Sequence, residues 1–283
     1  SIRRIDIMLT IYLKYIIINK NDENAKKLKK IPTFIKNFMK NTTIQEISIG
    51  CSNTAVYKIT KDNETFFLKI GKIPSLTKEY AALIWLNGKL SVPKCVYFCN
   101  DGTNEYLLTT TMAGEMSCSD SNLKKPEQTI KLLAHAIKQL QSVEILECPF
   151  RSDLNYKLGL VEYNVKNKLL TDSPSSKIGR ELKSYNNIFK YLIDKKPTTE
   201  QLVFSHGDTS LPNIFFKDNQ VSGFIDVGEC GVADKWFDIA ICYKSIIRNF
   251  PNREDLLKLF LNELQEEYSD KIEYYITLMD LYT

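Results

Sequence analysis

One short stretch constrains this chain of 283 residues more than any other feature. From Ser205 to Asn213 it reads Ser-His-Gly-Asp-Thr-Ser-Leu-Pro-Asn, and thirteen residues after Asn213 an Asp-Val-Gly turn begins at Asp226. Asp208 precedes Asn213 by five residues, which is the interval between Asp and Asn in the protein-kinase catalytic loop. Each of these residues is common in ordinary loops, but their order and spacing predict a site of phosphoryl transfer.

The residue types in this pattern fit that chemistry. Asp208 can accept or orient the proton of an attacking hydroxyl, and Asn213 and Asp226 offer the hard oxygen ligands that Mg²⁺ prefers. We interpret His206 as a residue that braces the loop rather than as a general base. The sequence therefore predicts a Mg²⁺-dependent site with Asp208 as the catalytic residue and Asn213 and Asp226 as metal ligands.

Composition excludes several other classes of protein. Hydrophobic residues make up 43% of the chain and charged residues 25%, as in soluble globular proteins. The net charge of +4 is too weak and too dispersed to indicate a nucleic-acid partner, and the apolar run 5–18 is too short to span a membrane. Seven cysteines without a CxxC pair favour a reducing environment. We expect a cytoplasmic protein with no nucleic-acid or membrane partner, either monomeric or weakly dimeric.

Hydrophobic periodicity predicts an α+β chain in three parts. These are an appended segment at 1–31, an N-lobe at 32–111, and a mainly helical C-lobe at 112–283 that contains the catalytic loop. The N-lobe pattern predicts a five-stranded antiparallel sheet, with strands at 44–49, 55–60, 65–70, 94–99 and 105–110. One helix at 76–89 is inserted after the third strand, and another is expected at 32–39. The appended segment could pack as a strand or as a helix.

The C-lobe is expected to be helical except around the catalytic stretch. Amphipathic spacing predicts helices at 126–143, 154–170, 178–193, 235–249, 253–267 and 271–281. Two short strands are expected, at 213–216 and 221–225.

Three stretches carry a specific resemblance. His206–Ile214, Gly223–Asp226 and Val232–Ala240 resemble the aminoglycoside 3'-phosphotransferases. The likeness extends over about residues 32–283. It implies a two-lobed, protein-kinase-like fold and an antibiotic-resistance kinase that uses ATP or GTP.

The resemblance also implies the nucleotide contacts. Lys69 would hold the α- and β-phosphates, and Glu79 would pair with Lys69 and fix its position. The remaining implied contacts are Phe67 stacked on the adenine, Ser52 in the loop over the phosphates, and backbone groups near Thr110 and Met112 at the adenine edge.

The acceptor side departs from the family pattern. Glu229 stands where the family usually has an arginine, and the chain ends with Asp280 and Tyr282 where the family has a pair of acids followed by aromatic residues. We assign all three residues to acceptor binding. The net charge is −5 over residues 251–283 but +4 over residues 150–200, so only one wall of the expected pocket suits a polycation.

Three functions remain open from the sequence. The leading hypothesis is transfer of the γ-phosphate to a hydroxyl of an aminoglycoside, with the 3'-hydroxyl as the expected position. This reaction would confer resistance to the antibiotic. The second hypothesis is a kinase of the same fold that acts on a macrolide, an amino alcohol or a sugar. It is motivated by the opposite net charges of the two segments expected to line the acceptor pocket. The third, motivated by Glu229, is a nucleotide-binding pseudo-kinase.

Overall fold

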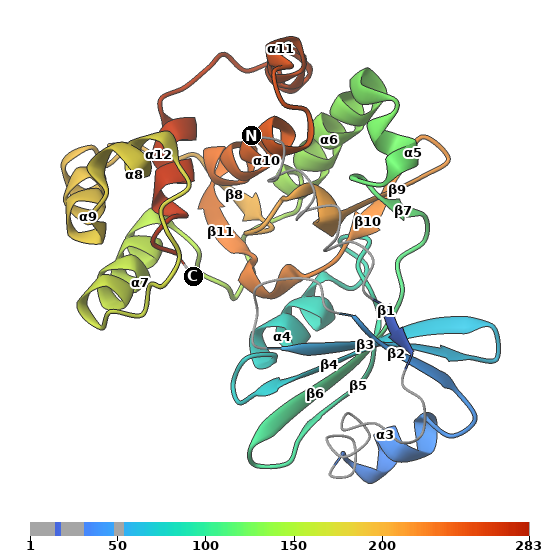
Figure 1. Ribbon diagram of the computed structural model, residues 1–283. Coiled ribbons are helices and arrows are strands. Elements are labelled where there is room, and N and C mark those ends of the chain that lie inside the picture. The colour runs from blue at the N-terminus through green and yellow to red at the C-terminus, as the bar shows by residue number, and fades with distance from the viewer. Residues whose placement is uncertain (1–14, 18–30, 48–53, 283) are drawn as a thin grey trace. The chain divides into compact units, whose positions relative to one another are not determined.

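The computed structural model describes residues 15–17, 31–47 and 54–282 (Figure 1). Contacts within the chain divide it into two compact units. Unit 1 comprises residues 1–87 and 93–111, and unit 2 comprises residues 88–92 and 112–283. The expected division had placed residues 88–92 in the first lobe. The two units are described separately below.

Unit 1 is built on one antiparallel sheet with the strand order β1-β2-β3-β4-β6-β5. The strands are β1 (Tyr15–Ile17), β2 (Thr43–Ile47), β3 (Ala55–Lys61), β4 (Glu64–Lys72), β5 (Cys95–Asn100) and β6 (Asn104–Thr110). The five predicted strands are present, which confirms the five-stranded sheet. The appended segment contributes β1, which pairs with β2 and adds a sixth strand at that edge.

Helices lie on both faces of this sheet, α3 (Thr33–Phe38) on one and α4 (Thr77–Leu86) on the other. Neighbouring residues of β5 show the two faces, because successive strand side chains point to opposite sides. Tyr97 stacks on Phe34 of α3, with ring centroids 4.1 Å apart, and Phe98 stacks on Tyr80 of α4 at 4.2 Å. The α3 face holds the hydrophobic core of the unit, and the α4 face carries the charged residues considered below.

A buried carboxylate fixes the start of α4. Glu105 in β6 accepts hydrogen bonds from the backbone N–H of Leu76 at 2.7 Å and of Thr77 at 3.0 Å. The first N–H groups of a helix have no partner within the helix and form its positive end, so a carboxylate there is favourable. Glu105 thereby ties α4 to the sheet and holds its first turn, which contains Glu79.

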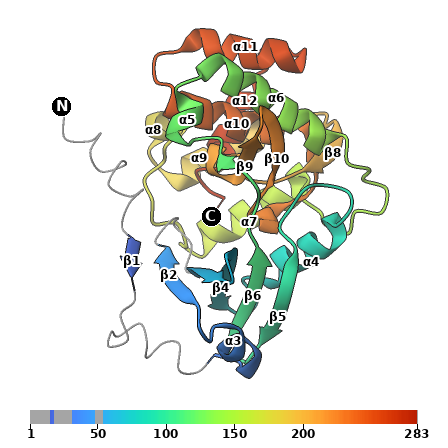
Figure 2. The same ribbon diagram turned by 90° about the vertical axis from the view of Figure 1, so that its right-hand side faces the viewer.

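Unit 2 is mainly helical, as predicted. Its helices are α5 (Asp120–Leu123), α6 (Pro126–Gln141), α7 (Leu154–Lys166), α8 (Lys177–Leu182), α9 (Tyr185–Asp194), α10 (Lys235–Asn249), α11 (Glu254–Leu264) and α12 (Lys271–Leu278). Helices α6 and α11 pack side by side (Figure 2). Across the described residues we find no helix with the length and apolar character needed to span a bilayer.

The prediction of a single helix at 178–193 was wrong. The structure has two helices there, because Lys183 takes a positive φ of 62° and Ser184 is extended, which ends α8 and starts α9 in a new direction. No glycine or proline marks this break in the sequence. The helix predicted at 271–281 also ends earlier, at Leu278.

Two small sheets in unit 2 position the catalytic stretch. One contains β10 (Gln220–Phe224), β9 (Ile214–Lys217) and β7 (Glu115–Met116), and the other contains β11 (Gly231–Asp234) and β8 (Leu202–Ser205). In the second sheet Ser205 pairs with Gly231. The loop that follows β8 therefore runs beside the turn that precedes β11. The sequence predicted β9 and β10 but not β7, β8 or β11.

Candidate active site

Lys69 and Glu79 form an ion pair within unit 1. The Lys69 Nζ atom lies 2.7 Å from one carboxylate oxygen of Glu79 and 2.9 Å from the other. Lys69 projects from β4 toward the face covered by α4, and the side chains of the two residues are 21% and 8% exposed. A contact with both oxygens in a partly buried setting restricts the lysine to a narrow range of positions. Contact of this pair with nucleotide phosphates stays a prediction.

Of the other residues assigned to nucleotide binding, Phe67 and Thr110 lie on strands of the same sheet as Lys69. Phe67 is half-buried on β4 and lies on the same face as Lys69, two residues away. The Thr110 N–H donates to the Lys94 carbonyl at 3.0 Å, and its hydroxyl accepts from the Lys94 N–H at 2.9 Å. Because the Thr110 N–H already donates to Lys94, a backbone N–H that bonds the adenine would have to come from a neighbour of Thr110. Ser52 lies outside the described residues.

Met112 begins the second unit and packs against the hairpin of β9 and β10. A Cβ atom at Gly223 would lie 2.1 Å from the flexible methyl end of Met112 and 2.6 Å from the Ser91 backbone carbonyl oxygen, which cannot move aside as easily. The Gly223 backbone has an extended φ of 158°, so its glycine is explained by packing and not by a left-handed conformation.

Asn213 holds the side chain of Asp208. The Asn213 amide nitrogen donates to the Asp208 carboxylate at 2.8 Å and to its backbone carbonyl at 3.0 Å. The Ser210 N–H donates to the other carboxylate oxygen of Asp208 at 3.2 Å. With its nitrogen directed to Asp208, the Asn213 amide directs its oxygen to the opposite side. The two predicted residues thus form one unit in which the amide orients the carboxylate.

His206 links this loop to the strand that leads to Asp226. Its Nε2 atom lies 2.9 Å from the Ile225 carbonyl oxygen, and its Nδ1 atom accepts from the Asp208 N–H at 3.2 Å. These partners require the neutral tautomer with the proton on Nε2. Both ring nitrogens are bonded to the backbone and the residue is fully buried, so His206 braces the loop, as we interpreted it from the sequence.

A buried carboxylate that the sequence did not assign also holds the loop. Asp238 in α10 accepts from the N–H of His206 at 2.7 Å and of Gly207 at 3.1 Å, and its backbone carbonyl accepts from the Thr209 hydroxyl at 2.7 Å. Burial raises the pKa of Asp238, while the hydrogen bonds from the two N–H groups oppose that rise. The available signal was an acidic residue between Phe237 and Ile239 in an apolar helix.

Gly207 allows the catalytic loop to pass close to the turn after Asp226. Its φ is +88°, and a Cβ atom there would lie 2.2 Å from the carbonyl oxygen of Glu229. Both the conformation and the space therefore require glycine. This contact fixes the backbone of Glu229 beside the residue that precedes Asp208.

Asp226 and Asn213 are brought together at the base of the β9–β10 hairpin. The Ile225 N–H donates to the Asn213 carbonyl at 3.0 Å, and the exposed Asp226 follows in a left-handed conformation with φ 62° and ψ 49°. A non-glycine residue in this conformation is strained, and such strain is concentrated at functional sites. The left-handed turn ends β10 and begins the short 3₁₀ turn Val227–Glu229.

These side chains fit Mg²⁺ by their chemistry. They supply an amide oxygen and carboxylate oxygens, and Mg²⁺ in kinase sites takes one or two carboxylates together with phosphate oxygens and water. Within the described ranges, three or more His, Cys, Asp or Glu side chains do not come together as a metal site. A set of one Asn and one Asp completed by substrate phosphates agrees with that observation.

Asp280 is engaged by the loop before α8. Its carboxylate accepts from the Ser175 N–H and hydroxyl, both at 2.8 Å, and from the Ser176 N–H at 3.0 Å. Lys244 donates to the Ser175 hydroxyl at 2.8 Å, and Arg180 donates to the Ser175 carbonyl. Burial lowers the pKa of Lys244, and the charge of Asp280 opposes this effect. Asp280 thus joins two segments 105 residues apart, a role that the sequence did not indicate; its contact with an acceptor stays a prediction.

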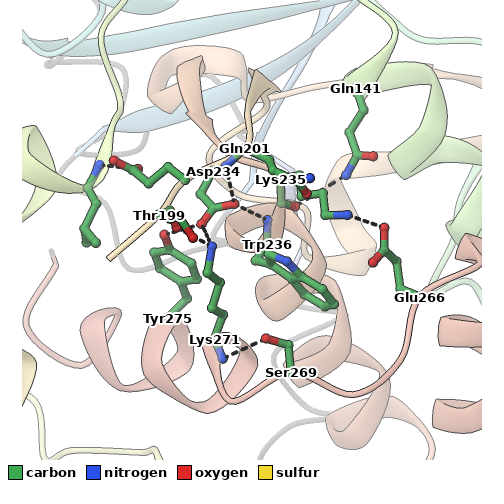
Figure 3. Close-up of polar contacts among 12 residues, drawn as sticks. Gln141, Thr199, Gln201, Asp234, Lys235, Trp236, Glu266, Ser269, Lys271 and Tyr275 are labelled. Carbon is green, nitrogen blue, oxygen red and sulfur yellow. Dashed lines mark hydrogen bonds and ion pairs between the residues drawn. The ribbon is translucent and has the colours of Figure 1, made fainter. Parts of the chain in front are cut away.

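Glu229 and Tyr282, which we assigned to the acceptor, lie next to each other. The Tyr282 hydroxyl donates to a carboxylate oxygen of Glu229 at 2.9 Å. The helix ahead of Tyr282 is anchored by Asp234, whose side chain is fully buried. One oxygen of Asp234 binds the ammonium of Lys271 at 2.6 Å and the hydroxyl of Tyr275 at 3.0 Å (Figure 3). Asp234 therefore fixes α12 and, through it, the end of the chain.

Comparison with known proteins agrees with this geometry. Residues 43–274 match the phosphotransferase enzyme family, and the chain belongs to that family. An aminoglycoside 3'-phosphotransferase of Enterococcus faecalis is 36% identical over 244 residues, which cover 82% of this chain and 91% of that protein. An aminoglycoside 3'-phosphotransferase of Acinetobacter baumannii is 29% identical, over 89% of this chain and 99% of that protein.

Solved structures show the same fold. The crystal structure of an aminoglycoside-3'-phosphotransferase of type VIII superposes with a TM-score of 0.78 at 21% identity, over 88% of this chain and 96% of that chain. Aminoglycoside phosphotransferase APH(3'')-Id of Streptomyces rimosus superposes with a TM-score of 0.77 at 20% identity, over 92% and 98% of the two chains. These likenesses confirm the protein-kinase-like fold that the sequence resemblance implied.

Proposed function

We propose that this protein transfers the γ-phosphate of ATP or GTP to a hydroxyl of an aminoglycoside, with the 3'-hydroxyl as the expected position, and so confers resistance to the antibiotic. The observation that carries the proposal is the 36% identity to an aminoglycoside 3'-phosphotransferase over 91% of that protein's length. The same proposal includes a cytoplasmic location, no nucleic-acid or membrane partner, and a monomer or weak homodimer.

Each residue of the candidate site has a role in this reaction. Asp208, oriented by Asn213, accepts the proton of the attacking hydroxyl and aligns its oxygen for in-line attack. Lys69, positioned by Glu79, holds the α- and β-phosphates. Asn213 and Asp226 would hold Mg²⁺, which supplies charge neutralisation of the phosphates when bound. The contacts of Ser52, Phe67 and the segment around Thr110 and Met112 with the base and phosphates belong to the same proposal.

The direct test measures ATP and GTP consumption with a panel of aminoglycosides and neutral alcohols. We expect turnover with aminoglycosides that carry the 3'-hydroxyl and none with analogues that lack it. Expression in a susceptible bacterium should raise resistance to the same compounds. Absence of turnover with every aminoglycoside would contradict the proposal.

The role of Asp208 can be tested in the same assay. General-base assistance is worth roughly 10²- to 10⁴-fold, so Asp208→Ala should lower turnover by that factor while nucleotide binding is retained. Asp218→Ala, on the turn between β9 and β10, is the matched control and should leave turnover unchanged. An Asp208→Ala protein with near wild-type turnover would refute the assignment.

A second candidate function is favoured by the surroundings of Asp280. Three donor groups of Ser175 and Ser176 make four hydrogen bonds to its carboxylate, and Lys244 and Arg180 donate to the same loop. This wall suits a polycation poorly, so we infer as the alternative a kinase of another hydroxyl compound with fewer positive charges. Turnover of a neutral alcohol or sugar, without turnover of any aminoglycoside, would favour it. Measurable phosphorylation of any acceptor would exclude a pseudo-kinase.

A further inference from the structure

We propose that Glu229 binds an ammonium group of the acceptor, and that Tyr282, itself held by Lys157, positions its carboxylate for this contact. The inference rests on the proposed function. It names a specificity-determining residue on the turn that follows Asp226. Glu229, Tyr282 and Lys157 all lie in unit 2.

The backbone of Glu229 is fixed beside the catalytic loop while its side chain is exposed. Its carbonyl oxygen lies against Gly207, where a Cβ atom would approach it to 2.2 Å, and accepts from the Ser152 hydroxyl at 3.5 Å. The residue ends the short 3₁₀ turn that begins directly after Asp226. An exposed negative charge is thereby held next to the residues that act on the acceptor hydroxyl.

Tyr282 directs this carboxylate toward the end of the chain. Its hydroxyl donates to Glu229 at 2.9 Å, and burial together with the charge of Glu229 raises the Tyr282 pKa, so the hydroxyl keeps its proton and remains a donor. Glu229 is exposed, so the charge of its carboxylate can reach an ammonium group while the tyrosine holds the side chain in place.

A buried lysine fixes the tyrosine ring. Lys157 is 1% exposed, and its ammonium lies 3.7 Å from the centroid of the Phe237 ring and 4.7 Å from that of Tyr282. It also donates to the Ser152 hydroxyl at 2.7 Å, the same hydroxyl that contacts the Glu229 carbonyl. A desolvated cation over two aromatic faces is a strong contact, so Lys157 is a positioning residue for both Tyr282 and Glu229.

The chemistry of this arrangement selects an amino sugar with an ammonium group near the reacting hydroxyl. Asp280 is engaged by backbone N–H groups and faces cations, whereas Glu229 presents its charge beside the catalytic loop. A carboxylate close to nucleotide phosphates would repel them, and its bond to Tyr282 draws it toward the chain terminus instead. A single charge-assisted contact of this kind is enough to discriminate an ammonium from a hydroxyl in the acceptor.

The test uses Glu229→Gln, which removes the charge but keeps an oxygen that can accept from Tyr282. Acceptor binding is measured by calorimetry with a non-hydrolysable ATP analogue present. Two aminoglycosides are compared that differ only in whether one ammonium group is replaced by a hydroxyl. The matched control is Glu267→Gln, which removes an exposed charge elsewhere in unit 2.

Glu229→Gln should weaken binding of the ammonium compound by roughly 10-fold or more and leave binding of the hydroxyl analogue and the KM for nucleotide unchanged. Tyr282→Phe should weaken binding of the ammonium compound by a smaller factor, because the charge remains but loses its orientation. Glu267→Gln should change neither compound. Equal effects of Glu229→Gln and Glu267→Gln, or equal losses for both aminoglycosides, would overturn the inference.

Binding and turnover separate this inference from the function on which it rests. If wild-type protein binds the ammonium compound and depends on Glu229 but transfers no phosphate to it, the proposed reaction fails and the binding role stands. If phosphate is transferred and Glu229→Gln leaves acceptor binding and the acceptor KM unchanged, the reaction stands and the inference is wrong. If wild-type protein binds neither aminoglycoside, the inference is wrong as well.

Discussion

Two buried residues, His206 and Asp238, hold the loop of Asp208 without a role in proton transfer. His206 links the Asp208 N–H to the Ile225 carbonyl, and Asp238 accepts the N–H groups of His206 and Gly207. Together they connect the catalytic loop, the strand before Asp226 and helix α10. The position of Asp208 relative to Asp226 thus depends on two residues outside the predicted set of catalytic and metal-binding side chains.

Loss of the Asp238 carboxylate should affect both stability and turnover. Asp238→Ala removes the acceptor of the buried His206 N–H and leaves the Gly207 N–H only the Ser205 hydroxyl. We therefore expect a loss of roughly 2–3 kcal/mol in the free energy of unfolding and, through misplacement of Asp208, of about 10²-fold in turnover. Asp238→Asn keeps one acceptor and should lose less of each. Urea denaturation and a turnover assay measure the two effects. An Asp238→Ala protein with wild-type stability would show that the loop is held by other contacts.

At the scale of elements, the break between α8 and α9 shows where a local conformation opposes its sequence. Lys183 is exposed and takes φ 62°, ψ −30°, which costs a non-glycine residue about 1–2 kcal/mol. Glycine would avoid that cost but would lose more entropy on folding, by up to about 1 kcal/mol. The net gain from glycine at this position is therefore small and positive.

Lys183→Gly should raise the free energy of unfolding by roughly 0.5 kcal/mol for this reason. Lys195, at the end of α9, is equally exposed but has φ −105°, so Lys195→Gly is the matched control and should lower stability by about 0.5–1 kcal/mol. Thermal or urea unfolding of the two variants gives the comparison. The same sign of change in both would contradict the explanation.

The elements also show how far the sequence could predict this structure. Helix α10 has the predicted bounds, β3 begins at the predicted residue and β6 ends at the predicted residue, because their hydrophobic periods are regular. The break between α8 and α9 at Lys183 could not be predicted from the sequence, because no glycine or proline marks it. The bonds of Asp280 to Ser175 and of Tyr282 to Glu229 join residues 105 and 53 positions apart, and no local pattern encodes such pairings.

At the scale of the whole molecule, each of the two units should control its own kinetic parameter. Unit 1 supplies the Lys69–Glu79 pair, and unit 2 supplies the loop of Asp208 with Asn213 and Asp226. If Lys69 contacts the nucleotide phosphates, its loss should weaken nucleotide binding. If Asp208 acts only on the acceptor hydroxyl, its loss should lower turnover at saturating nucleotide.

Lys69→Ala should therefore raise the KM for nucleotide by roughly 10-fold or more, the value of a charge-assisted contact, and leave the acceptor dissociation constant unchanged. Lys72→Ala is the control, since Lys72 is an exposed lysine on the same strand. Its removal changes the net charge equally and should leave the nucleotide KM unchanged. Because Lys69→Ala leaves Glu79 without its cation, urea unfolding must show that the variant is folded under assay conditions. Equal rises in the nucleotide KM for the two lysine variants would refute the phosphate contact, because they would show that Lys69 contributes only to the net charge.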